Sequence, residues 1–584
     1  MAREQRIGSI LAIDCGTVLT KAILLDQVDG SYHFVARGAA LTTAGSPWRD
    51  IAVGIQHAVE QIEDITGRVL LDEAGRLIIP QRESITGVDA CVAVGSAAPP
   101  LRVVLAGLVP ELSLSTAQRA VSGTYARVED LIVQDPRRRM SEEEQIRVVL
   151  QRKPDVLCVV GGTDGGATLP VLELVETMAL ACSMLPEGER PQMFFAGNTA
   201  LRQKVVDVVG GQAPVHSVDN VLPSPTVENP VGLQKELDSL YRQKQLAQLP
   251  GGEVFQRWLN VPLMPVSESF ARHVQYLWYL DESPKGTLGI EVGAANTLVT
   301  AVFGGEPAVT VGAGMGSVYG LERILEKRSA EAFLRWMPTP FKPEQVQSVL
   351  LYRSLWPASI PQEAEELWLE QGIIREVIRE ALQTARSAWR PGRAQPYLQL
   401  TPLFDPILVG GGALAVAPRP GQVALMVLDA VEPIGISTLL LDVHGLAPVL
   451  GAVATLKPLA AVEVVDNGGL VNLATVIAPV GPGRKGEVIL RIRVHYEKGG
   501  SLDVEVPYGS LEVLPLPPGE EAVLELRPRG RIDVGLGPGR GGKRRVRGGL
   551  VGLIVDARGR PLQLPADPYA RMAQVQQWLW DMGG

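Results

Sequence analysis

The sequence is poor in cysteine and histidine, the side chains that most often hold structural metals or disulfide frameworks. It contains four cysteines and six histidines among 584 residues. Cys15, Cys91, Cys158 and Cys182 show no CxxC spacing, and the histidines form no HxH or HExxH pattern. We therefore expect buried, reduced thiols rather than a disulfide framework or a cysteine-based metal site.

The sequence also lacks a basic charge excess and a long apolar run. Its net charge is −9, which gives no overall basic surface for bulk binding of nucleic acid. The most hydrophobic later stretch, 423–441, contains Asp429, Glu432 and Pro433, so it is a poor membrane span. Residues 1–7 contain no apolar core of a signal peptide. We expect a cytoplasmic protein that binds neither membranes nor bulk nucleic acid.

Two stretches far apart in the chain look like copies of one sequence motif. They are residues 11–21 (LAIDCGTVLTK) and 288–298 (LGIEVGAANTL). In each, a short apolar run ends in a carboxylate, Asp14 or Glu291, and a glycine follows two residues later. A second apolar run and a glycine-containing turn come next, which predicts a meander of three strands. The repeat predicts an α/β protein with two pseudo-symmetric lobes that face each other across a cleft.

Further apolar runs also end in glycine-rich corners. Residues 155–160 precede Gly161-Gly-Thr-Asp-Gly-Gly166 and a helical pattern over 169–184. Residues 406–409 precede the triple glycine that ends at Gly412. A helix is also predicted from Ser46-Pro47, which would open it, to Gly67, which would close it, and further helices are predicted over much of 229–280 and 331–389.

Composition and pattern divide the 584 residues, which exceed one ordinary core, into three predicted domains. The first lobe is 1–285, the second is 286–457, and a β-rich domain with a terminal helix is 458–584. Alternating apolar and polar residues between Pro/Gly turns predict the antiparallel sheet of the third domain. That domain could bind a partner, cover a sheet edge or stabilise a homodimer. Its basic segment 540–547 is either a solvated loop or a contact for an anionic partner.

The chemistry of the corners suits phosphate groups. Backbone N–H groups at a tight turn without Cβ can approach phosphate, the side chain of Lys21 offers a cation, and Asp14 could hold water on a Mg²⁺ ion. Lys21 could instead be an ordinary salt-bridged lysine of a strand. Asp164 could orient an attacking water, or it could cap the following helix. The predicted catalytic residues are Asp14, Asp164 and Glu291, and the predicted ATP-binding residues are Gly16, Thr17, Thr20, Lys21, Gly161, Gly162, Thr163, Gly293, Ala294, Ala295, Asn296, Gly410, Gly411 and Gly412.

The order of the three corners resembles the actin, heat-shock chaperone and sugar-kinase superfamily of ATPases. In that resemblance 14–17 is phosphate motif one, 291–295 is phosphate motif two and 410–412 is the adenosine motif. The segments 159–166 and 195–198 narrow the resemblance to one family, the MutL/GlmL glutamate mutase accessory family, which is unrelated to mismatch-repair MutL. The resemblance covers about residues 8–457 and implies ribonuclease H-like lobes, ATP with Mg²⁺, and ATP-dependent reactivation of an adenosylcobalamin-dependent mutase.

The second corner departs from the family pattern, which typically reads Asp-x-Gly-Gly-Ala-Thr-Thr-Asp. Glu291 replaces the acid, Ala294 replaces the second glycine, and Leu298 replaces the closing acid. These changes predict slow or absent ATP hydrolysis. They leave open the alternative that the protein is a non-catalytic actin-like scaffold or interaction protein with degraded ATPase motifs. A third hypothesis, beside the reactivating factor and the scaffold, is that the protein is a small-molecule kinase.

Overall fold

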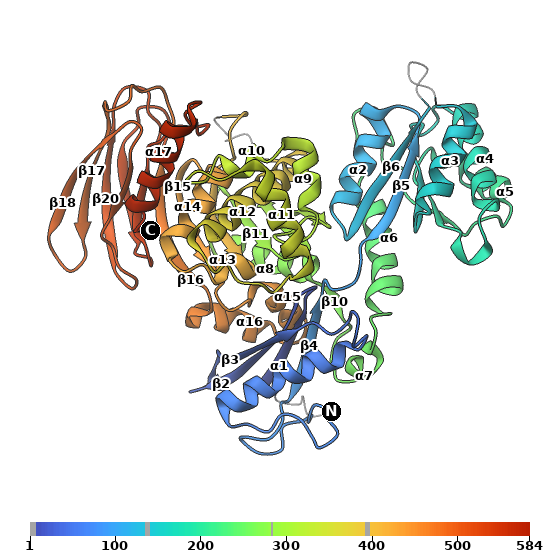
Figure 1. Cartoon of the computed structure of the whole chain (residues 1–584), viewed down its shortest axis with the longest axis horizontal. Helices are drawn as coiled ribbons and strands as arrows, with labels where there is room; N and C mark the ends of the chain where they lie inside the picture. The colour runs from blue at the N-terminus through green and yellow to red at the C-terminus, as the bar shows by residue number, and fades with distance from the viewer. Residues whose placement is uncertain (1–6, 135–139, 282–283, 392–396, 584) are drawn as a thin grey trace. The chain divides into compact units, whose positions relative to one another are not determined.

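The computed structural model of the chain describes residues 7–134, 140–281, 284–391 and 397–583. The chain forms two compact units (Figure 1). Unit 1 comprises Met1–Ala97, Pro250–Val309 and Met315–Gly584, and unit 2 comprises Ala98–Leu249 and Thr310–Gly314. The expectation of no signal peptide rests almost entirely on residues 1–6, which lie outside the described residues.

The first sheet of unit 1 begins with the predicted meander of β1 (Ser9–Cys15), β2 (Leu19–Val28) and β3 (Ser31–Leu41). The short strands β4 (Ala90–Gly95) and β10 (Met264–Pro265) extend it in parallel, in the order β10-β4-β1-β2-β3. Helix α1 (Ile51–Thr66) packs on β2 and β3. Its capping residue is Asp50, whose side chain accepts from the Ala52 N–H, so the helix opens later than Ser46-Pro47 predicted.

The second sheet of unit 1 repeats this plan with β11 (Gly286–Val292), β12 (Asn296–Phe303) and β13 (Glu306–Ala313). Strands β14 (Phe404–Gly410) and β15 (Gly435–Leu441) extend the sheet in parallel to β11. Three later strands complete its eight: β16 (Val471–Ala478), β22 (Gly552–Asp556) and β19 (Leu511–Leu514). Residues on both sides of position 457 therefore share one sheet, and the boundary drawn there stays a prediction.

The C-terminal residues also form an antiparallel sheet of their own, as the alternating pattern predicts. Its order is β18 (Ser501–Pro507), β17 (Val488–Tyr496), β20 (Glu521–Pro528) and β21 (Gly542–Arg547). The terminal helix α17 (Pro568–Asp581) packs against α14 (Pro420–Val431) of the second lobe. The predicted fold class is confirmed in that the chain is α/β, with two pseudo-symmetric sheets that share one strand plan and an antiparallel C-terminal sheet.

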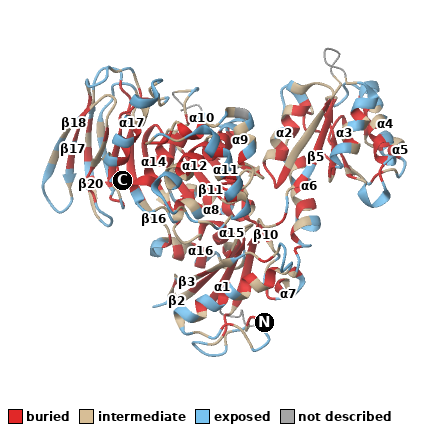
Figure 2. Cartoon of the chain, in the orientation of Figure 1, coloured by how far each residue is buried: buried red, intermediate tan, exposed pale blue. Residues whose placement is uncertain are grey.

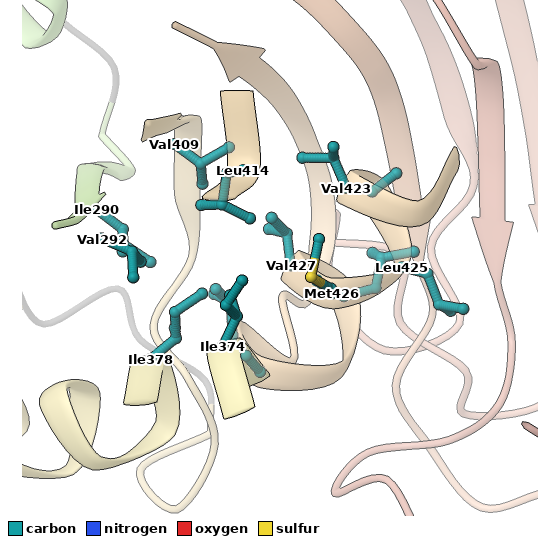
Figure 3. Packing of buried hydrophobic residues seen from close by; sticks show 14 of the residues in the cluster. Ile290, Val292, Ile374, Ile378, Val409, Leu414, Val423, Leu425, Met426 and Val427 are labelled. Carbon is teal, nitrogen blue, oxygen red and sulfur yellow. The ribbon is translucent and has the colours of Figure 1, made fainter. Parts of the chain in front are cut away.

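Helices cover the second sheet and enclose the core drawn in Figure 3. Ile290 and Val292 of β11 and Val409 of β14 pack with Ile374 and Ile378 of α12. Each such side chain contributes roughly 1.5–3 kcal/mol when it is fully buried. The remaining helices of unit 1 are α7 (Gly252–Gln256), α8 (Val266–Asp281), α9 (Leu321–Arg328), α10 (Glu331–Leu334), α11 (Pro343–Leu355), α12 (Ala364–Ala385), α13 (Gly412–Ala415), α15 (Ala447–Leu456) and α16 (Pro458–Val464).

Unit 2 is a separate doubly wound domain that the sequence analysis did not single out. Its sheet is parallel throughout, in the order β6 (Ala126–Val133), β5 (Leu101–Gly107), β7 (Val156–Val159), β8 (Gln192–Phe195) and β9 (Val215–Ser217). Its central strands β5, β7 and β8 are largely buried, as Figure 2 shows for β5, whereas the edge strands β6 and β9 are mostly partly exposed. Its helices are α2 (Ser115–Ser122), α3 (Glu142–Arg152), α4 (Leu169–Ser183), α5 (Arg202–Val209) and α6 (Val231–Tyr241).

The four cysteines are buried and unpaired, as predicted. Burial raises the pKa of the Cys158 thiol to about 12 and that of Cys182 to about 11, so these thiols stay protonated at neutral pH.

Candidate functional site

The two repeated corners of unit 1 have the same turn. The N–H of Gly16 donates to the carbonyl of Leu19 (3.2 Å), and the N–H of Gly293 donates to the carbonyl of Asn296 (2.9 Å). A Cβ on Gly16 would lie 2.6 Å from the Leu19 oxygen, and one on Gly293 would lie 2.9 Å from the Asn296 oxygen. Both positions therefore require glycine because the turn itself leaves no space for a side chain.

The residues that follow these glycines present unused donors. Within the part of the chain that the structure describes, the N–H groups of Thr17, Val18, Ala294 and Ala295 donate to no protein acceptor. Consecutive backbone N–H groups in a turn form a concave anion site. Each corner therefore offers two adjacent donors.

A small set of charges joins the two corners. Asp14 is the last residue but one of β1, Glu291 is the last residue but one of β11, and both side chains are buried. Lys21 of β2 donates to Asp14 Oδ2 at 3.0 Å. The other oxygen of Asp14 (Oδ1) and Glu291 Oε2 are buried without a hydrogen-bond partner. Native structures rarely leave buried carboxylate oxygens without partners, so these atoms indicate a site that is completed by a ligand.

The same charges act on one another. Burial raises the pKa of Glu291 to about 8, against the attraction of Lys21 and with further help from Asp442 and Asp14. Burial opposes the charged form of Lys21, but Asp14 and Glu291 together outweigh it, so the pKa of this ammonium is raised. Lys21 therefore stays charged, whereas Glu291 is mostly protonated at neutral pH.

The third corner, Gly410 to Gly412, lies against the second corner through main-chain atoms. Gly411 has a φ of +105°, and a Cβ there would lie only 2.1 Å from the carbonyl oxygen of Val292. A Cβ on Gly410 would lie 2.4 Å from Glu291 Oε2. Gly412 has no neighbour within 4 Å of such an atom. The first two glycines thus let β14 end directly beside β11, and Gly412 leaves open space next to that contact.

Sequence reasoning missed Asp442, which follows β15 in the same sheet. Its carboxylate accepts from the N–H groups of His444, Gly445, Leu446 and Ala447 (2.7–3.2 Å) and so fixes the start of α15. An Asp at the end of a buried strand, three residues before a glycine, was the available signal.

The loop that Asp442 fixes reaches the first sheet. A Cβ on Gly445 would lie 3.5 Å from the Lys21 Nζ, and the ring of His444 stacks on Phe34 of β3 at 4.2 Å. Arg37 of β3 donates to the Val443 carbonyl at 3.4 Å. These contacts hold the ends of β1, β2, β11 and β15 around one charged centre.

The hydroxyl groups predicted at the first corner are engaged within the protein. Thr17 Oγ1 donates to the Ser96 carbonyl at 3.2 Å, and Thr20 Oγ1 is buried at 3.0 Å from Thr42 Oγ1. The Thr42 hydroxyl in turn donates to the Gly16 carbonyl at 2.7 Å. Both predicted residues therefore shape the corner, and their contact with a ligand stays a prediction.

Asp164, Gly161, Gly162 and Thr163 lie together in unit 2. Asp164 Oδ1 accepts from the backbone N–H and hydroxyl of Thr199 (both 3.0 Å) and from Asn220 Nδ2 (2.9 Å). Hydrogen bonds from Asn220 and Thr199 lower the pKa of this carboxyl. Asp164 does not cap α4, whose N-cap is Thr168 without a side-chain bond. It instead ties the glycine loop to the loop after β8, and its catalytic role stays a prediction.

The donor set of unit 1 fits a phosphate chain with Mg²⁺. It supplies unused N–H groups for anionic oxygens, the ammonium of Lys21, and unpartnered carboxylate oxygens on Asp14 and Glu291 for a cation or its water.

Comparison with known proteins places the chain in a family. Residues 10–468 match the MutL protein family, so this two-lobed α/β protein belongs to that family. Protein MutL of Clostridium tetanomorphum is 26% identical over 334 residues, which are 56% of this chain and 64% of that protein. The match thus spans slightly less than two thirds of that relative's length.

Solved structures with partial similarity carry low scores. A nucleotide-free acetone carboxylase has a TM-score of 0.35 and 13% identity, with 87% of this chain and 82% of that chain covered. A diol dehydratase-reactivating factor in nucleotide-free form has a TM-score of 0.28 and 11% identity, with 79% and 100% covered. Among the described residues, no helix combines the length and hydropathy that a membrane crossing requires.

Proposed function

We propose that the protein binds Mg-ATP between the three corners of unit 1 and acts as a chaperone-like reactivating factor of the MutL family. The observation that supports this proposal most directly is the charged centre of Asp14, Lys21 and Glu291, with unpaired N–H groups on both repeated turns. A cytoplasmic location belongs to the same proposal.

Each corner has a defined task. The N–H groups of Thr17 and Val18, and those of Ala294 and Ala295, would bind phosphate oxygens from two sides. Lys21 would neutralise part of the phosphate charge, and Asp14 would hold Mg²⁺ through water. The bound Mg²⁺ supplies charge neutralisation of the phosphates. The open space beside Gly412 would take the adenosine.

Lobe closure would transmit nucleotide binding to a partner. The partner in this proposal is an adenosylcobalamin-dependent mutase, which the resemblance to glutamate mutase accessory proteins implies. The contacts of the 442–445 loop with Lys21, Arg37 and Phe34 support coupling, because any change at the corners reaches both sheets of unit 1.

One observation favours the alternative of a non-catalytic scaffold. Glu291 has a pKa of about 8, so in the absence of ligand it is a poor anion for positioning a metal-bound water at neutral pH. Slow hydrolysis, or binding without hydrolysis, is the expected consequence.

The test is phosphate release from Mg-ATP by the purified full-length chain, with and without a cobalamin-dependent mutase loaded with inactive cofactor. The proposal expects slow release that the mutase stimulates, and loss of both rates in Asp14→Ala. ATP binding without release would favour the scaffold. Transfer of phosphate to a metabolite, lost in Asp14→Ala, would favour a kinase. Failure to bind ATP would refute the proposal.

A further inference from the structure

Two neighbouring cavities in unit 1 are lined by arginine side chains. One, of about 380 Å³, is lined by Arg328, Arg379 and Arg386, with Glu432 as its one acidic lining residue. The other, of about 320 Å³, is lined by Arg335, Arg379 and Arg571 and by no carboxylate. Arg379 of α12 belongs to both, and no residue of the three corners lines either cavity. We call these five arginines the arginine site.

The arginine site holds more positive than negative charge. Glu376, whose side chain is fully buried, is shared by Arg335, by Arg328 at 3.3 Å and by Arg379 at 3.8 Å. Two further carboxylates take part: the buried Glu380 pairs with Arg328 at 3.0 Å, and the partly buried Glu432 pairs with Arg379 at 2.9 Å. Five guanidinium groups therefore face these three carboxylates and a fourth, the exposed Glu331 beside Arg571.

The positive charges of Arg386 and Arg571 are compensated least by neighbouring carboxylates. Arg386 has no carboxylate partner among the described residues, and its Nη2 donates only to Thr401 Oγ1, at 2.9 Å. The residue is exposed overall, and the partial burial of its guanidinium lowers the pKa of Arg386 because the attraction of Glu432 does not outweigh this burial. The nearest carboxylate to Arg571 is that of Glu331, at 3.9 Å, whose side chain is 65% exposed. The side chain of Arg571 is only 18% exposed, and a largely buried charge of this kind at the wall of the second cavity favours a bound counter-ion.

Arginine N–H donors without acceptors also indicate an anionic ligand at this site. The Nε atoms of Arg335, Arg379 and Arg571 are buried and have no hydrogen-bond acceptor. These are all three arginines that line the second cavity. Buried donors without acceptors are uncommon in native proteins, and three of them around one cavity indicate a missing acceptor group.

We propose that the arginine site binds a small dianion, a phosphate ester or a dicarboxylate. Both offer paired oxygens that a guanidinium fork binds with two hydrogen bonds, and the three arginines of the second cavity, which no carboxylate lines, would bind their two charges. Arg379 belongs to α12 of the second lobe, and Arg571 belongs to the C-terminal helix α17. A bound dianion would therefore connect α17 and the preceding segment of Leu562 to Ala566 with the helices of the second lobe.

The test is titration calorimetry of the full-length protein with inorganic phosphate and, separately, with glutarate, at an ionic strength held constant with potassium chloride. Saturable binding of either ligand is expected, and the ligand that binds more tightly identifies the class. Arg571→Gln should weaken that binding at least tenfold, and so should Arg379→Gln, which removes the arginine that lines both cavities. The matched control is Arg491→Gln, an exposed arginine of β17 paired with Glu505, which should leave it unchanged.

Phosphate could also enter the corners of unit 1, so Asp14→Ala is included. Binding that survives Asp14→Ala but is lost in Arg571→Gln would support the arginine site. Binding that is lost in Asp14→Ala and kept in both arginine variants would overturn it, as would the absence of saturable binding of both ligands to the wild type.

Discussion

Replacing Gly411 by alanine is the sharpest test of the contact between the second and third corners. The added Cβ would lie 2.1 Å from the Val292 carbonyl oxygen, so the two backbones must separate by about 1 Å to reach ordinary contact. The φ of +105° adds a second penalty, because an L-residue pays about 1–2 kcal/mol in left-handed conformations. Overpacking typically costs about 1–3 kcal/mol.

Together these terms predict that Gly411→Ala destabilises the protein by about 2–5 kcal/mol and weakens ATP binding. The matched control is Gly412→Ala, because a Cβ at this position meets nothing within 4 Å and the residue begins α13. There alanine should be neutral or slightly stabilising. Urea unfolding followed by tryptophan fluorescence gives the stabilities, and calorimetric titration gives the affinities. Equal stability of the two variants would refute the close approach of β14 and β11.

Three further substitutions test the charged groups. Glu291→Gln should remove a pH dependence of the stability. The pKa of the Glu291 carboxyl rises from 4.5 to about 8 on folding, so wild-type stability falls as the pH rises between these two values. At about 1.4 kcal/mol per pKa unit, the variant should be more stable than wild type at pH 9 by a few kcal/mol. A variant less stable than wild type in urea at pH 9 would contradict this. Lys21→Met should destabilise the protein by about 3–5 kcal/mol in urea at pH 8, because it leaves the Asp14 carboxylate buried without its cation; unchanged stability would show that the ion pair is not formed. Asp164→Ala should lower the stability of unit 2 in thermal unfolding by about 0.5–1.5 kcal/mol, because it removes the hydrogen bonds of an exposed carboxylate to Thr199 and Asn220 and water can take its place, whereas an unchanged transition would argue against these bonds.

The local architecture of the corners could be predicted from the sequence because it depends on neighbouring residues. An apolar run, a carboxylate and a glycine turn specify a strand and a hairpin within a few residues, and both meanders form as expected. The reason for the glycines at 16 and 293 differs from the prediction. They satisfy the geometry of the turn, and the donors available to a ligand come from the residues that follow them.

The pairing of strands that lie far apart in the chain could not be predicted from the sequence. Strands β16, β22 and β19 join the sheet of the second lobe although they lie among the strands of the antiparallel sheet in the sequence. β16 and β22 are apolar runs buried on both faces, unlike the alternating strands of the antiparallel sheet, but this pattern does not specify which strands they pair with. The insertion of unit 2 was hidden for a similar reason, since its alternation of strands and helices continues that of the first lobe. Asp442 and Arg37 enter the site only through tertiary contacts.

The measurement that tests the central claim most directly is calorimetric titration of the full-length protein with Mg-ATP. Wild type should be compared with Asp14→Ala and with Asp72→Ala, a control carboxylate in a surface loop paired with Arg76. The account predicts saturable, micromolar binding that Asp14→Ala abolishes and Asp72→Ala retains. No binding to the wild type, or equal binding by Asp14→Ala, would contradict the claim that the repeated corners hold a nucleotide.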